Sequence, residues 1–280
     1  MFENQIRESV VAGSFYSSDP VILKKTINKY IENAPLKNIE NITSLVCPHA
    51  GYIYSGQVAA CSYKQIKGKE YDCIFIIAPS HSEYFDFNSI FAGTAYQTPL
   101  GIVEVDVNRC KYLESESGYR DFIKLSGYGH RREHSLEVQL PFLQVCMSKI
   151  KIVPIVMGSQ SKQNIESLGN SIGKLFKGQN ILIVASTDLS HYHPYEVAEH
   201  LDNKVLQIIK EFDTKKFIEE FTADELEMCG GGPVAAAMIA SKILGSDSSE
   251  ILCYNNSGDV SGDKSAVVGY LAAAFYKSHK

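Results

Sequence analysis

Short apolar runs rich in valine and isoleucine recur along this 280-residue chain, and turn residues bound each of them. They occupy 42–46, 73–78, 151–157, 181–186, 250–254 and 266–275. Runs of this length that are apolar throughout are typical of strands buried on both faces of a sheet. Amphipathic stretches of helical length separate most of them, at 20–33, 56–67, 163–177, 195–212 and 233–244. This alternation predicts an α/β fold in which helices cover a central sheet.

The segment 87–107 departs from the alternation, because it predicts two strands joined by a turn at Thr98-Pro99-Leu100-Gly101. Such a pair either makes part of the sheet antiparallel or forms a flap, so we expect a mixed sheet. The chain has no internal repeat and no long linker rich in proline, glycine or serine. We therefore expect a single domain over residues 1–280.

Composition narrows the class of ligand. The formal net charge of −5 and the lack of a lysine and arginine block argue against nucleic acid and anionic membranes as partners. No apolar stretch is long enough to cross a bilayer, and the N-terminal residues do not resemble a signal peptide. Seven cysteines, several of them in apolar runs, indicate reduced thiols. We expect a cytoplasmic protein that binds small molecules or other proteins, with no nucleic acid and no membrane partner.

Polar residues follow three of the predicted strands directly. His49 comes after the first run, His81 after the second, and Asp188 with His191 after the fourth. In open α/β sheets, the loops beyond the carboxyl ends of the strands are where ligands bind. A single loop histidine is more often solvated or hydrogen-bonded than functional, but three in equivalent places favour one shared site.

Two imidazoles and one anionic ligand form a three-point metal site that leaves coordination positions open. We expect His49 and His81 to be the imidazoles and Cys229, in a loop that leads into a helix, to be the third ligand. A helix N-terminus and a nearby metal both lower the pKa of a thiol. The alternative is that Cys229 is one more small buried residue. The glycines at 230–232 allow close approach to a ligand, and they could instead cradle a phosphate or carboxylate.

Three further residues are candidates for catalysis. Asp188 and His191 could form a carboxylate-oriented imidazole that moves protons near the metal, although Asp188 could simply cap the turn that holds His191. Tyr54 could donate a hydrogen bond to a bound substrate or could serve packing alone. Ser135 could cap a helix that Pro141 kinks, and we expect His134 either to be structural or to lie just behind the residues that contact the metal.

Several long motifs together resemble the Memo family across nearly the whole chain. They are AGSFY (12–16), PHAGYIYSG (48–56), APSH (78–81), EHSLEVQLPFL (133–143), STDLSHY (186–192), CGGGP (229–233) and NNSGDVSGDKSAVVGY (255–270). The resemblance implies a fold similar to that of class III extradiol ring-cleaving dioxygenases. That fold is a three-layer αβα sandwich around a mixed, largely parallel central sheet.

The resemblance also implies a metal site. The family pattern falls on His49, His81 and Cys229, with Asp188, His191 and Tyr54 lining the same pocket. In the dioxygenases, two histidines and a glutamate hold iron. A cysteine in place of the carboxylate makes the ligand set softer, so Fe(II) is the expected ion and copper or zinc are alternatives, and ring cleavage is doubtful.

The family suggests partners as well. Small-molecule substrates or dioxygen are expected at the pocket, and prokaryotic relatives are often encoded near a radical-SAM protein and an AMMECR-type protein. Animal members are described as adaptors that bind phosphotyrosine peptides and as metal-dependent redox proteins.

Three functional hypotheses follow, in order of preference. The first is a non-haem metal-dependent oxidoreductase, in which His191 transfers protons. The second is a non-enzymatic binding module that holds an anionic group of a partner, such as a phosphopeptide, at the glycine-rich helix start. The third is a metal-free enzyme with Cys229 as nucleophile and His191 as base.

Overall fold

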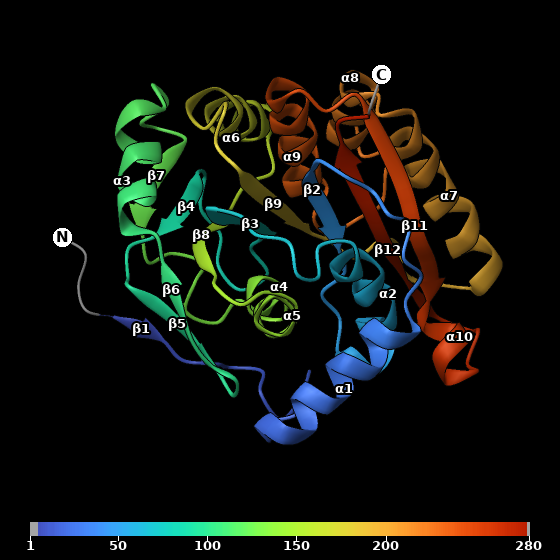
Figure 1. Cartoon of the computed structure of the whole chain (residues 1–280). Coiled ribbons are helices and arrows are strands. Elements are labelled where there is room, and N and C mark those ends of the chain that lie inside the picture. The colour runs from blue at the N-terminus through green and yellow to red at the C-terminus, as the bar shows by residue number, and fades with distance from the viewer. Residues whose placement is uncertain (1–4, 279–280) are drawn as a thin grey trace.

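The computed structural model describes residues 5–278, which form a mixed sheet with helices on both faces (Figure 1). The main path across the sheet has the order β1-β5-β6-β8-β3-β9-β2-β12-β10. Its strands are β1 (Ile6–Arg7), β5 (Ala95–Thr98), β6 (Gly101–Val105), β8 (Lys151–Met157), β3 (Cys73–Pro79), β9 (Ile181–Ser186), β2 (Ile42–Cys47), β12 (Val267–Tyr276) and β10 (His191–His193). Off this path, β11 (Ser248–Asn256) pairs with β12, and β4 (Asn88–Phe91) pairs with β8 and with β7 (Ile123–Ser126).

The five neighbours from β6 to β2 run parallel, whereas β12 is antiparallel to β2 and to β11. The predicted α/β class with a mixed, largely parallel central sheet is therefore confirmed. All six predicted strands form within two residues of their expected bounds. Residues of the central strands β3 and β9 are buried without exception, as continuous apolar runs require.

Helices cover both faces of the sheet. On one side lie α1 (Pro20–Asn33), α2 (Tyr52–Lys64), α4 (His134–Glu137) and α5 (Leu140–Cys146). On the other lie α3 (Val107–Glu116), α6 (Lys162–Leu175), α7 (Tyr195–Glu211), α8 (Thr214–Thr222) and α9 (Gly231–Leu244), while the short α10 (Ser257–Ser261) follows β11. Helix α9 packs on β9, β2 and β3, and α6 packs against α9 (Figure 1). Within the described residues, no helix is long and apolar enough to span a membrane.

The segment 87–107 forms three strands, where the sequence predicted two. The hairpin of β5 and β6 turns at the predicted place, since Thr98 pairs with Gly101. Before this hairpin, the strand is interrupted around Gly93. A Cβ atom at Gly93 would lie 2.4 Å from the Phe91 ring and 2.6 Å from the Gln5 carbonyl oxygen. The backbone at Gln5 therefore packs closely against Gly93, between β4 and β5. β4 pairs with β7 and β8, whereas β5 pairs with β1 and β6.

The expectation of a helix capped by Ser135 was wrong. Glu133 caps α4 by accepting a hydrogen bond from the Ser135 backbone N–H, and α5 begins separately with Pro141 in its first turn. Proline fits there because the first-turn N–H groups have no partner within the helix.

Candidate metal centre

Three neighbouring parallel strands carry the residues at the centre. β3, β9 and β2 lie side by side, and their last residues are Pro79, Ser186 and Cys47. His81, Asp188 and His49 each follow two residues later. Because the strands are parallel, these side chains meet at one edge of the sheet.

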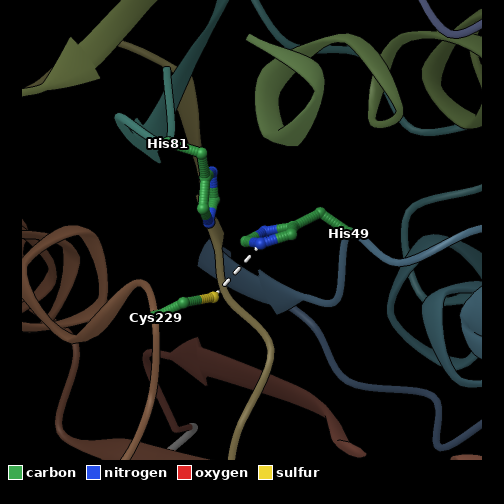
Figure 2. Close-up of side chains that lie close together, drawn as sticks. All are labelled: His49, His81 and Cys229. Carbon is green, nitrogen blue, oxygen red and sulfur yellow. Dashed lines mark hydrogen bonds between the residues drawn. The ribbon is translucent and has the colours of Figure 1, made fainter. Parts of the chain in front are cut away.

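Cys229 reaches the same place from a distant part of the sequence. It lies in the loop before α9, and the side chains of His49, His81 and Cys229 point toward one another (Figure 2). Donor atoms of the three residues all lie within 4.8 Å of one another. The Cys229 sulfur is 3.1 Å from His49 Nε2. The centroids of the two imidazole rings are 5.1 Å apart, and the ring planes are inclined at 77°. The structure thus brings together the three residues that the sequence proposed as ligands.

The hydrogen bonds of His49 fix which of its nitrogens carries the proton. Ser186 Oγ donates its single proton to the Ser135 carbonyl oxygen, at 2.7 Å. It must therefore accept the 2.9 Å hydrogen bond from His49 Nδ1. Burial lowers the pKa of His49 well below its usual value, and the neighbouring histidines lower it further. His49 is consequently a neutral imidazole with the lone pair of Nε2 facing Cys229, as a metal ligand requires.

His81 has the same arrangement around a different acceptor. Its Nδ1 donates to Glu133 Oε1 at 2.9 Å, which leaves Nε2 for the centre. Burial would raise the pKa of Glu133, but hydrogen bonds from His81 and Ser135 outweigh it and lower that pKa to about 2. Glu133 is therefore an ionised acceptor at neutral pH.

The loop around Cys229 is held by backbone and side-chain hydrogen bonds. The Asp188 N–H donates to the Cys229 sulfur at 3.2 Å, and Gln160 Nε2 donates to the Cys229 carbonyl oxygen at 2.7 Å. Burial raises the pKa of the Cys229 thiol, and the Asp188 charge adds to the effect. The expected lowering by the helix N-terminus is therefore not found, and a thiolate would need a metal cation beside it.

The glycine run has a packing explanation. A Cβ atom on Gly230 would lie 2.2 Å from the Ser186 carbonyl oxygen, and one on Gly232 would lie 2.5 Å from the Met157 sulfur. The Gly230 N–H donates to Thr187 Oγ1 and the Gly232 N–H to Gln160 Oε1. Because these two N–H groups already have partners within the protein, they are not free to bind an anion at the helix start.

Asp188 does not orient His191. Its Oδ1 accepts a 2.8 Å hydrogen bond from the His49 N–H, and its Oδ2 lies 4.0 Å from His49 Nε2. Burial raises the pKa of Asp188 to about 7, although backbone N–H groups of His49 and Ala50 partly oppose the rise. His191 lies in strand β10, and its N–H donates to Glu227. Asp188 therefore neither pairs with His191 nor caps the turn that holds it, the two roles that the sequence predicted. Its carboxylate contacts the loop that carries His49.

Two other candidate residues differ in how the structure relates them to the centre. The centroid of the His134 ring is 4.8 Å from that of the His81 ring and 5.5 Å from that of the His49 ring, so this residue packs beside both proposed ligands. Tyr54, in the first turn of α2, is 42% exposed, and its hydroxyl has no hydrogen-bonding partner among residues 5–278. It is free to bind a ligand at the surface.

The donor set fits a transition metal. A tetrahedral ion with nitrogen and thiolate ligands places its donor atoms roughly 3.3–3.6 Å apart. The 3.1 Å separation of His49 Nε2 and Cys229 is already close to that value, and the full set, within 4.8 Å, would have to contract by a small amount. Both imidazoles have Nε2 available, and the thiol loses its proton on binding.

Fold and donor set together define an α/β protein with a two-histidine, one-cysteine candidate metal centre at the carboxyl edge of its parallel strands. Residues 7–274 match the family model described as Memo-like protein. MEMO1 family proteins of Nitrosopumilus maritimus, Methanocaldococcus jannaschii and Saccharolobus solfataricus are each 38% identical to this chain, with 96% of the chain and 99% of each relative aligned. The chain belongs to the Memo family, as its sequence motifs indicated.

Proposed function

We propose that His49, His81 and Cys229 hold one transition-metal ion and that the protein is a non-haem metal-dependent oxidoreductase. The observation that carries this proposal is the convergence of three donor atoms within 4.8 Å at one edge of the sheet. Iron(II) is the proposed ion, with copper or zinc as alternatives, because a nitrogen and thiolate set binds all three. The proposed substrate is a small organic molecule or dioxygen.

A bound iron or copper ion would supply one-electron chemistry and an open coordination position. The protein's own groups would hold protons around it. Asp188, with a pKa of about 7, can hold or release a proton at Oδ2 near neutral pH. His191 is proposed as a second proton carrier, and its pKa is lowered by burial, so it is a neutral base. Tyr54 is proposed to donate a hydrogen bond from its exposed hydroxyl group to a bound substrate.

Metal reconstitution tests this proposal. Apo protein would be titrated without oxygen with Fe(II), Cu(I) and Zn(II), and the iron and copper forms would then be oxidised and reduced while electron paramagnetic resonance is recorded. We expect stoichiometric binding and reversible one-electron oxidation. Binding of zinc alone, or no redox change in the bound iron and copper forms, would contradict an oxidoreductase.

One observation favours a second candidate, a cysteine enzyme. The Cys229 thiol donates to His49 Nε2 at 3.1 Å, so the base of such an enzyme would be His49 rather than His191. Burial opposes activation of this pair, because it raises the pKa of the thiol and lowers the pKa of the imidazole. The test is alkylation of the apo protein by iodoacetamide: rapid modification of Cys229 at neutral pH supports the nucleophile, and a resistant Cys229 contradicts it.

A further inference from the structure

Glu133 holds His81 at two points. Its Oε2 accepts the His81 backbone N–H at 2.6 Å, and its Oε1 accepts the ring Nδ1–H at 2.9 Å. The Glu133 side chain is 1% exposed, whereas the His81 side chain is 33% exposed. A partly exposed loop histidine would otherwise rotate and exchange its proton between the two ring nitrogens.

The helix that carries Glu133 is itself fixed to the strands of the centre. Ser135 Oγ lies 3.1 Å from the carbonyl oxygen of Pro79, the last residue of β3, and 2.8 Å from Glu133 Oε1, and it can donate its single proton to either. The Ser135 carbonyl oxygen accepts the hydrogen bond from Ser186, whose hydroxyl holds His49. Both histidines of the centre therefore depend on the start of α4.

A different interpretation of these residues is a second metal site, because donor atoms of His81, Glu133 and His134 also lie within 4.8 Å of one another. The hydrogen bonds argue against it. Glu133 Oε1 already accepts from His81 Nδ1 and the Ser135 N–H, and the Ser135 hydroxyl lies 2.8 Å away. A metal bound to His81 Nδ1 would displace the proton on that nitrogen. His81 Nε2 is free for the first site only while Nδ1 carries the proton.

We propose that Glu133 is the positioning residue of the centre: its carboxylate locks His81 with Nδ1 protonated, so that Nε2 is presented to the ion held with His49 and Cys229. This inference rests on the proposed metal site. Hydrogen-bonded carboxylates behind metal-binding histidines commonly fix the ring and its tautomer, and their loss weakens metal binding about 10- to 100-fold.

The first test needs no metal. The ring nitrogen shifts of His81 in isotope-labelled apo protein report which nitrogen carries the proton, and the signal is assigned by its loss in His81→Gln. We expect the Nδ1-protonated form in the wild type and a mixture of both tautomers in Glu133→Gln. A wild-type His81 protonated on Nε2 overturns the proposal, whether or not the variant folds.

The second test is Co(II) affinity of the same proteins. The matched control is Glu114→Gln, because Glu114 also accepts a backbone hydrogen bond, from Leu125 at 2.8 Å, but lies in α3. We expect affinity to fall about 10- to 100-fold in Glu133→Gln and to stay unchanged in the control. Equal affinity in folded Glu133→Gln and wild type overturns the role of Glu133. A wild type that binds no metal overturns the proposed function instead, and the tautomer measurement still decides how Glu133 acts on His81.

Discussion

Two polar clusters border α4, and they differ in what their atoms bond to. The Glu137 carboxylate accepts hydrogen bonds from Arg7, Tyr16 and the backbone N–H groups of Val10 and Val11. In the candidate metal centre, the Nε2 atoms of both histidines and the Cys229 sulfur face one another instead. Among residues 5–278, His81 Nε2 has no hydrogen-bonding partner.

This difference separates a cluster that holds the chain together from one prepared for a ligand. Burying polar groups is favourable only when they have partners, and the Glu137 cluster supplies all of them from the protein. In the centre, the lone pair of His81 Nε2 has no partner among residues 5–278, and a metal ion would supply one. Substitutions in the first cluster should therefore lower stability, and substitutions in the second should lower metal affinity.

The largest expected effect is on the stability of the Glu137 cluster. Glu137→Ala leaves Arg7 buried without its carboxylate and should lower the free energy of unfolding by about 3–5 kcal/mol. Urea unfolding of the apo protein measures it. In the control, Cys229→Ala should lower stability by only about 1 kcal/mol. A similar loss in both variants would remove the distinction between the two clusters.

The next largest effect is expected at Gly230, which follows Cys229 and packs closely against the end of β9. In Gly230→Ala, the new methyl group would meet the Ser186 carbonyl oxygen and the Thr187 side chain, so the loop must shift. We expect a loss of about 1–3 kcal/mol in stability, as for other overpacked sites, together with weaker metal binding. Gly127→Ala is the control, because a Cβ there meets no atom within 4 Å. Unchanged metal affinity in Gly230→Ala would show that the backbone position of Cys229 is not critical.

Ser186→Ala tests the same comparison by a substitution in the candidate metal centre. It removes the acceptor of His49 Nδ1, so metal affinity should fall about 10- to 100-fold, while stability changes less than in Glu137→Ala. Isothermal titration with Zn(II) measures the affinity. The control is Ser171→Ala, which removes a buried hydroxyl bonded only to the Ser167 carbonyl oxygen in α6. Equal affinities in the two serine variants would show that the tautomer of His49 is not held by Ser186.

The smallest effect near neutral pH is a pH dependence, which develops only below about pH 6.5. Burial lowers the pKa of His130 to about 3, and its carbonyl oxygen accepts a hydrogen bond from Arg7. The unfolded chain protonates His130 near its usual pKa of about 6.5, so it binds more protons than the folded protein below that pH. Stability should therefore fall as the pH falls from about 6.5 toward 3, with His130 contributing up to about 1.4 kcal/mol per pH unit.

Denaturant unfolding at a series of pH values tests the contribution of His130. The slope of stability against pH should be shallower in His130→Gln than in the wild type. The exposed His200→Gln is the control and should keep the wild-type slope. A wild-type slope in His130→Gln would show that this histidine takes up its proton equally in the folded and unfolded states.

The fold was predictable because buried strands and covering helices leave local patterns of apolar residues. Placement of His49 and His81 at one edge followed from the same patterns, since both come directly after parallel strands. Hydrogen-bonding partners left no such pattern. Glu133 reaches His81 across 52 positions, and Asp188 reaches His49 across 139. The short spacing of Asp188 and His191 suggested a local pair, but the three-dimensional contact lies elsewhere.

Metal content tests the central claim most directly. Wild-type protein and the His49→Ala, His81→Ala and Cys229→Ala variants would be purified without oxygen, reconstituted with metal and analysed for bound elements, with folding checked by circular dichroism. We predict near-stoichiometric metal in the wild type and a loss of most of it in each folded variant. A wild type that stays free of metal, or variants that retain metal at the wild-type level, would contradict a metal centre at these three residues.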